Sequence, residues 1–215
     1  MKRNKSFGRA VIVLLAANML MFLGGCATQY PLLPSAQGIP PSTTSPENYR
    51  YLIGPGDTFS IFVWRNPEVS SSVIVRPDGM ITTTLIEDLP VTGKTPTQVA
   101  REIEKALARF IKDPMVTVMM SGFVGPYSEQ IRVVGEAAKP QALPYRQRMT
   151  LLDVMIAVGG LTTYAAGNQA TIVRMVDGKQ RQFNVHIDDL IKDGDISANV
   201  DMLPGDTLII PESWF

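Results

Sequence analysis

The sequence supplies few of the side chains on which catalysis and metal binding usually depend. Its 215 residues include one cysteine, Cys26, and one histidine, His186. A lone cysteine cannot form an internal disulfide, and a lone histidine without a cysteine beside it does not complete a typical zinc site. No serine lies in a nucleophile elbow, and the glycines form no phosphate-binding loop. We therefore expect a protein that is not an enzyme and that holds no cofactor and no metal, with His186 a partly buried side chain without a chemical role.

The acidic residues form no catalytic or calcium-binding pattern either. Glu87–Asp88 and Asp188–Asp189 are neighbours in sequence, and neighbours on a strand point to opposite faces, so we expect both pairs in solvated turns. Residues 193–201 alternate acidic and polar side chains as a calcium loop does. That loop requires Gly at its sixth position and Glu at its twelfth, but here the residues are Ala198 and Pro204. We expect a polar turn.

A hydrophobic segment long enough to span a membrane is also missing. Ala10–Leu23 is an apolar run of 14 residues interrupted only by Asn18. At about 1.5 Å per residue such a run reaches roughly 21 Å, against the roughly 30 Å of the hydrocarbon core. Basic residues precede the run and small residues follow it, which is the arrangement of an export signal. We predict a signal peptide over residues 1–25.

The residues that close this segment, Leu23-Gly24-Gly25-Cys26, resemble a bacterial lipobox. In a lipobox a peptidase cleaves before the cysteine after its thiol has been acylated, so the resemblance makes Cys26 the lipidation site. Ala27, rather than Asp, follows the cysteine, which in lipoproteins of Gram-negative bacteria implies the outer membrane. We expect a lipid anchor in the outer membrane on its periplasmic face. The alternative is an uncleaved anchor with a coincidental cysteine.

The charges that remain after residue 25 do not favour nucleic acid as a partner. Four of the 20 Lys and Arg residues lie in the predicted signal, and none of the 20 Asp and Glu residues do. This leaves 16 basic against 20 acidic residues, a net charge of −4. No basic cluster remains to neutralise phosphates, which supply most of the affinity for nucleic acids.

The rest of the chain predicts a tether and two small α+β modules in tandem. Residues 27–48 contain five prolines and a single charge, Glu47, so we predict an extended tether over residues 26–48. The modules are predicted over residues 49–125 and 126–215. In each, short strands alternate with turns around one main helix.

In the first module we expect strands at residues 59–64, 73–75, 80–85 and 116–120. Pro77-Asp78-Gly79 supplies a turn between the second and the third of these. Thr95 and Gln98 form a capping box that begins a helix, which Asp113–Pro114 ends. The predicted apolar face of this helix consists of Val99, Ile103, Leu107 and Phe110.

In the second module we expect strands at residues 131–134, 171–176 and 181–185. Thr150 caps a helix that has Asp153 at its third position and ends at Gly159–Gly160. Because Asp153 is the one polar residue within 151–158, we expect this helix to be buried on all sides. Asp177-Gly178 predicts a hairpin between the last two strands.

The tetrapeptide PGDT occurs twice, at residues 55–58 and 204–207, each time directly before alternating apolar residues. Proline presets φ for a turn, glycine accepts a positive φ, and aspartate can accept hydrogen bonds from nearby backbone amides. We interpret both copies as one reused structural turn rather than as a ligand site. The turns consist of Pro55, Gly56, Asp57, Pro204, Gly205 and Asp206. Each should begin a strand that ends at an edge of its fold.

Exposed aromatic side chains are the remaining candidates for binding. Such rings can present flat faces to sugars or to partner subunits. The candidate contact residues are Trp64, Tyr127, Tyr145, Trp214 and Phe215. For Trp64, packing in the core is the alternative.

Taken in order, these motifs resemble the outer-membrane polysaccharide export family, lipoproteins that move capsule and exopolysaccharide out of Gram-negative cells. The resemblance runs through residues 49–64, 75–120, 131–162 and 203–212. The first two stretches look like the family's export domain, and the last two look like its soluble-ligand-binding β-grasp (SLBB) module. The closing PESWF is reminiscent of members linked to exosortase systems. The family has no catalytic residues to transfer, so only Cys26 carries over as a chemically defined site.

The resemblance implies a lipid-anchored ring of identical subunits that receives polysaccharide from an inner-membrane co-polymerase. Pore-forming relatives end in an amphipathic helix, whereas here five residues follow Ile210. We therefore expect an outer-membrane β-barrel partner, with this chain as a periplasmic conduit or adaptor. The main alternative is a carbohydrate- or peptidoglycan-binding envelope lipoprotein without a transport role. An enzyme is the third.

Overall fold

The computed structural model describes residues 41–42 and 48–213. The predictions for the signal peptide, for Cys26 and for Trp214 and Phe215 lie outside the described residues, as does most of the predicted tether. The described part is an α+β fold with two separate hydrophobic cores, one built from residues 53–116 and the other from residues 131–210. Among these residues no helix combines the length and the apolarity needed to cross a membrane.

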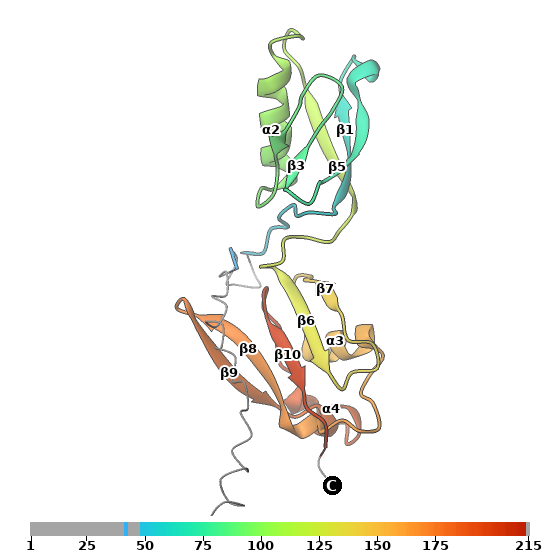
Figure 1. Cartoon of the computed structure of the whole chain (residues 1–215), viewed down its shortest axis with the longest axis vertical. Coiled ribbons are helices and arrows are strands. Elements are labelled where there is room, and N and C mark those ends of the chain that lie inside the picture. The colour runs from blue at the N-terminus through green and yellow to red at the C-terminus, as the bar shows by residue number, and fades with distance from the viewer. Residues whose placement is uncertain (1–40, 43–47, 214–215) are drawn as a thin grey trace, which may run out of the picture. The chain divides into compact units, whose positions relative to one another are not determined.

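The first core lies between a three-stranded antiparallel sheet and one helix (Figure 1). The sheet has the order β2-β1-β5, with β1 at Thr58–Val63, β2 at Ser71–Ile74 and β5 at Val116–Gly122. Helix α2, Pro96–Leu107, packs against this sheet with Val99, Ala100, Ile103 and Leu107 buried. A three-residue 3-10 turn, η3, covers Pro67–Val69. Burial alternates along β1, because successive side chains point to opposite faces of a strand.

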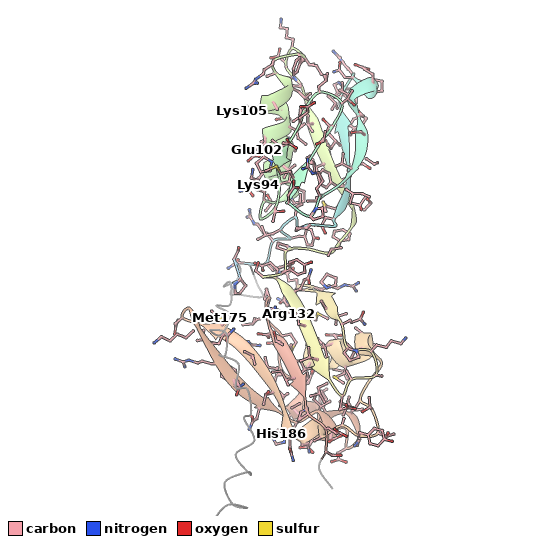
Figure 2. The ribbon with its side chains drawn as sticks, in the orientation of Figure 1. Lys94, Glu102, Lys105, Arg132, Met175 and His186 are labelled. Carbon is pink, nitrogen blue, oxygen red and sulfur yellow. The ribbon has the colours of Figure 1, made fainter. Side chains whose placement is uncertain are left out.

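The capping box predicted for α2 is confirmed. The Thr95 hydroxyl accepts the Gln98 N–H at 3.3 Å, and the Gln98 side chain accepts the Thr95 N–H at 2.8 Å. Lys94 and Glu102, which are adjacent in Figure 2, form an ion pair beside this turn. The predicted end of the helix is wrong: it ends at Leu107, so Phe110 lies beyond its apolar face and is 63% exposed.

The predicted strand at residues 80–85 is also too long. Strand β3 covers only Met80–Ile81, and it pairs with β4, Leu89–Pro90, in a separate two-stranded sheet. The turn at residues 77–79 does form, since the Gly79 N–H donates to the Arg76 carbonyl at 2.9 Å. It connects two different sheets, which a local turn signal cannot reveal.

The second core lies under a five-stranded mixed sheet of order β7-β6-β10-β8-β9 (Figure 1). The strands are β6 Gln130–Gly135, β7 Ala142–Pro144, β8 Ala170–Val176, β9 Lys179–Val185 and β10 Thr207–Ile210. The helices are α3 Leu151–Val158 and α4 Ile187–Ile191, with 3-10 turns η4 Gly167–Gln169 and η5 Ile196–Ala198. Strand β10 pairs parallel to β6 and antiparallel to β8.

Two local predictions for this module are confirmed. Thr150 and Asp153 form a capping box, and α3 ends at Gly159 in the left-handed region. The β8–β9 hairpin turns at Asp177 and Gly178, whose φ values are 51° and 73°. Two positive φ angles give the turn type whose twist matches that of the flanking strands.

Two predictions that depend on packing are wrong. Helix α3 is not buried on all sides, because Ile156 is 70% exposed and Ala157 is also exposed. The strands that follow the two PGDT turns, β1 and β10, do not lie at an edge, since each has a partner strand on both sides.

Candidate functional site

Asp57 of the first PGDT turn is fully buried and is surrounded by hydrogen-bond donors. Its Oδ2 accepts the Gly54 N–H at 2.8 Å, and its Oδ1 accepts the N–H groups of Val124 at 2.6 Å and Gly125 at 2.9 Å. The Tyr51 hydroxyl lies 2.8 and 2.7 Å from the two oxygens. The carboxylate therefore joins the turn to a backbone segment 67 and 68 residues further along the chain.

Gly54 explains why these two segments come so close. A Cβ on Gly54 would lie 2.1 Å from the carbonyl carbon of Gly125, which no real side chain tolerates. A glycine is therefore required here for close approach of two backbones rather than for a special φ.

Asp206 of the second PGDT turn is also fully buried, but its main partner is a side chain. Its Oδ2 accepts the Leu203 N–H at 2.7 Å, and Arg174 reaches both oxygens, with Nε 2.9 Å from Oδ1 and Nη2 2.6 Å from Oδ2. This bidentate geometry is the strongest form of Arg–carboxylate pairing. Arg174 also donates to the Asp201 carbonyl at 2.9 Å.

The two turns share a backbone geometry. In each, the aspartate side chain accepts the N–H of the residue three positions earlier, and its own N–H donates to the carbonyl of that same residue, at 3.1 Å in the first turn and 3.2 Å in the second. Gly56 and Gly205 have φ values of 88° and 80°. Because donors of the protein itself occupy both carboxylates, each turn is tied to other segments of its own module.

Burial raises the pKa values of three residues near the first turn. It raises the pKa of Tyr51 far above its ordinary value, with the Asp57 carboxylate as the next cause. Burial, followed by the charge of Glu129, raises the pKa of Tyr49 to about 12. Burial also raises the pKa of Glu129, whose Oε1 accepts the Ser42 N–H at 2.6 Å while Oε2 has no partner among the described residues.

The structure places the three described aromatic candidates in different environments. Trp64 is 55% exposed, and its ring packs edge-on against Phe62 with centroids 6.4 Å apart. Tyr127 is 73% exposed. Tyr145 is buried and packs edge-on against Tyr49 with ring centroids 4.8 Å apart, so its ring is part of the second core. Core packing, the alternative for Trp64, is thus excluded, and contact with sugar or partner stays a prediction.

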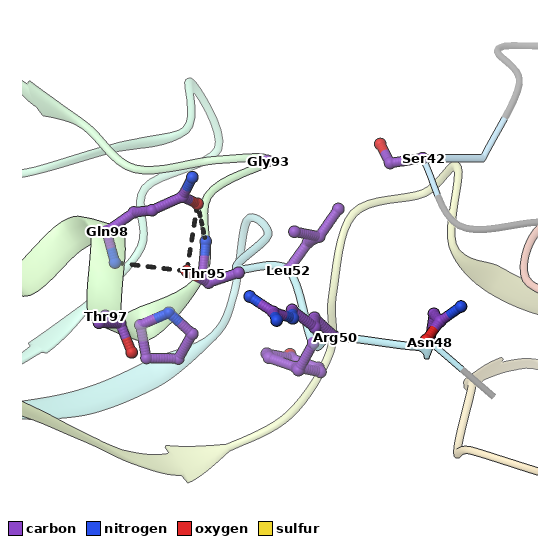
Figure 3. Close-up of a pocket in the computed structure, with 10 residues that line it drawn as sticks. Ser42, Asn48, Arg50, Leu52, Gly93, Thr95, Thr97 and Gln98 are labelled. Atoms are coloured by element: carbon purple, nitrogen blue, oxygen red, sulfur yellow. Dashed lines mark hydrogen bonds between the residues drawn. The ribbon is translucent and has the colours of Figure 1, made fainter. Parts of the chain in front are cut away.

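A groove of about 790 Å³ lies beside the first turn of α2 (Figure 3). Arg50, Leu52 and Gly93 line it together with the capping box, whose hydrogen bonds use the groups of Thr95 and Gln98 internally. Among the described residues, no carboxylate and no histidine lines this groove, and its hydroxyl groups come from Ser42, Tyr51 and Thr97 together with Thr95.

Two other polar candidates, His186 and Asp195, contact residues close to them in sequence. His186 is exposed rather than partly buried as predicted, and its Nδ1 lies 3.2 Å from Asp189 Oδ2. Asp195 accepts the Ser197 N–H and hydroxyl, which lowers the pKa of Asp195. Within residues 41–42 and 48–213, no three His, Cys, Asp or Glu side chains gather as metal ligands would.

Known proteins share both modules of this chain. Residues 45–121 match the family model described as polysaccharide biosynthesis/export protein, and residues 129–210 match the model of the SLBB domain. The chain is 28% identical over 186 residues to the EPS I polysaccharide export outer membrane protein EpsA of Ralstonia nicotianae, a match that covers 75% of this chain and 47% of the relative. It is 28% identical over 149 residues to the exopolysaccharide production protein ExoF of Rhizobium meliloti, covering 63% of this chain and 34% of the relative.

The chain spans less than half the length of these curated relatives. The two family matches nevertheless follow one another in the order predicted from the sequence and correspond to the two cores. The chain belongs to the polysaccharide export family, with an export domain followed by an SLBB domain.

Proposed function

We propose that this chain is a lipid-anchored periplasmic component of exopolysaccharide or capsule export across the outer membrane. Several copies form a ring-shaped conduit or adaptor. An inner-membrane co-polymerase supplies the polysaccharide, and a separate outer-membrane barrel completes the route. Acylated Cys26 holds the assembly at the periplasmic face of the outer membrane.

The observation that carries this proposal is the succession of an export domain and an SLBB domain in one chain. The relatives that share this arrangement are named for polysaccharide export and exopolysaccharide production. The described residues add a supporting observation: the buried carboxylates of Asp57 and Asp206 accept hydrogen bonds from groups of the fold itself. A conduit requires a stable scaffold rather than reactive groups.

Deletion of the gene tests the proposal. We expect secreted polysaccharide to fall and polymer to accumulate in the cell envelope, with secretion restored by the wild-type gene. The Cys26→Ala variant should fail to restore secretion. The same variant should succeed when its signal peptide is replaced by that of another outer-membrane lipoprotein, including the cysteine that becomes lipidated. Normal secretion in a deletion strain without a second copy of the gene would refute a role in transport. The envelope-binding lipoprotein would then be the better account.

A further inference from the structure

One end of the first module is formed by two connections that the fold holds side by side. Strand β1 pairs with β5 so that the end of β1 faces the start of β5. The turn that follows β1 and the loop that precedes β5 therefore lie at the same end of the module, beyond the last turn of α2 (Figure 1). The Trp64 N–H donates to the Met115 carbonyl at 2.9 Å and joins the two connections. We call this end the tip and define it as residues 64–70 and 105–115.

Three large apolar side chains are exposed at the tip. Trp64 is 55% exposed, Phe110 is 63% exposed and Met115 is 65% exposed. Helix α2 ends before Phe110, so this side chain is not part of the first core. Groups of exposed apolar side chains mark sites at which a fold contacts another protein or a membrane.

The tip is basic, whereas the rest of the chain is acidic. The tip has four basic residues against two acidic ones, Glu68 and Asp113, and so a net charge of +2. Since the chain after residue 25 has a net charge of −4, its remaining residues carry −6. The four basic side chains are exposed, and none of them forms an ion pair within the described part of the chain. They are Arg65, Lys105 (labelled in Figure 2), Arg109 and Lys112.

This combination of side chains fits a phospholipid surface. Tryptophan is favoured at the boundary between lipid headgroups and acyl chains, and arginine and lysine close to a bilayer are attracted to anionic lipids. Long basic side chains can lay their apolar stems along that boundary while their charges stay at the phosphates. The cores of protein interfaces, by contrast, are depleted in lysine.

The chain that precedes the described residues is long enough for the tip to reach a membrane. Ser42 lines the groove beside the first turn of α2, and helix α2 spans about 18 Å from that groove toward the tip. Residues 27–41 separate Ser42 from Cys26, and 15 residues span at most roughly 45 Å at about 3 Å per residue. A lipid anchor at Cys26 therefore keeps the tip within reach of the bilayer. Because the anchor raises the effective concentration of the tip at the bilayer, a weak contact is sufficient.

We propose that the tip docks onto the periplasmic surface of the outer membrane. Trp64, Phe110 and Met115 enter the headgroup region, and the basic side chains of the tip contact lipid phosphates. The inference rests on the proposed function for the anchor at Cys26 and goes beyond it, because an anchor on a tether leaves the first module free to rotate. A second contact holds the module in one orientation at the membrane.

Quenching of tryptophan fluorescence tests this contact in the full, lipidated chain. The chain carries Trp214→Phe, so that Trp64 is its single tryptophan, and is reconstituted into vesicles of phosphatidylethanolamine and phosphatidylglycerol. Phospholipids brominated on the acyl chain quench a tryptophan only at close contact, so the Trp64 emission should lose most of its intensity and shift to the blue. The matched reporter is Thr97→Trp in a chain with Trp64→Phe and Trp214→Phe, since Thr97 is exposed at the other end of α2. Its emission should stay nearly constant, although the same anchor holds it.

Charge reversal tests the role of the basic side chains. The variant R109E/K112E should lose most of the quenching of Trp64. The variant K139E/R181E changes the net charge equally at exposed positions of the second module and should retain the quenching. Equal quenching of the two reporters, an unquenched Trp64 in a chain that floats with the vesicles, or equal quenching in both charge variants would each overturn the proposal. Flotation reports the anchor alone and no polysaccharide is involved, so failure of the tip is distinguishable from failure of the proposed function.

Discussion

Replacement of Asp57 by asparagine should destabilise the first module strongly, although the two side chains have the same size. In the amide, one oxygen remains to accept the N–H groups of Val124 and Gly125, as Oδ1 does now. The position of Oδ2 becomes an NH2 group, which meets the buried Gly54 N–H, donor against donor. An orphaned buried N–H costs about 1 to 3 kcal/mol, and the remaining bonds lose the strength that an ionised acceptor gives them. We expect a loss of about 2 to 4 kcal/mol, and of about 4 to 6 kcal/mol for Asp57→Ala.

Urea unfolding measures this loss. In a Trp214→Phe background, Trp64 is the single remaining tryptophan and reports on the first module. With a slope near 1 kcal/mol/M for so small a module, Asp57→Asn should lower the unfolding midpoint by about 2 to 4 M. The matched control is Asp113→Asn, an exposed aspartate in a turn, which should shift the free energy of unfolding by less than about 0.5 kcal/mol. Equal midpoints for the two variants would refute the reasoning that this carboxylate holds the module together.

Three further outcomes follow from the same structure. Arg174→Met leaves Asp206 buried with one side-chain partner fewer and should destabilise the second module by about 3 kcal/mol in calorimetry, whereas Arg181→Met on exposed strand β9 should not. The pKa of Tyr49 is raised from 10.0 to about 12 in the folded chain, so the stability that this residue contributes is complete below pH 10 and is lost as the pH rises toward 12. The variant Tyr49→Phe should therefore show a smaller fall in the free energy of unfolding over that pH range. An unchanged fall would contradict the raised pKa. Leu151 is fully buried on α3, so Leu151→Ala should lower the free energy of unfolding by about 2 to 5 kcal/mol. Ile156 lies on the exposed side of the same helix, so Ile156→Ala should lower it little. Similar decreases for both variants would mean that Ile156 is covered.

Local signals in the sequence predicted the elements whose stabilising contacts are also local. The capping boxes at Thr95 and Thr150 join residues three apart, and the β8–β9 turn is made by Asp177 and Gly178 themselves. Each of these features depends on side chains within a few residues of one another, so a short stretch of sequence is sufficient to predict it. The order of the two domains could be predicted for a similar reason, because each carries its own series of motifs.

Contacts between distant residues could not be predicted in this way. Nothing near Asp57 indicates that its partners are the N–H groups of Val124 and Gly125, and nothing near Asp206 indicates Arg174. The exposure of Ile156 likewise depends on which side of α3 faces the sheet, since an apolar sequence alone does not say how much of a helix its module can cover.

The position of β10 has a consequence for how the second module is made. This strand comes last in the described chain but lies in the middle of its sheet, joining β6 on one side and β8 on the other. A chain that emerges from its N-terminal end first can therefore complete the first module, whose last strand is β5, well before the second. Until residues 207–210 arrive, the β7–β6 pair and the β8–β9 hairpin have no shared strand, and each exposes an open edge to proteases and to other chains. Loss of this final strand would thus divide the module in two rather than shorten it.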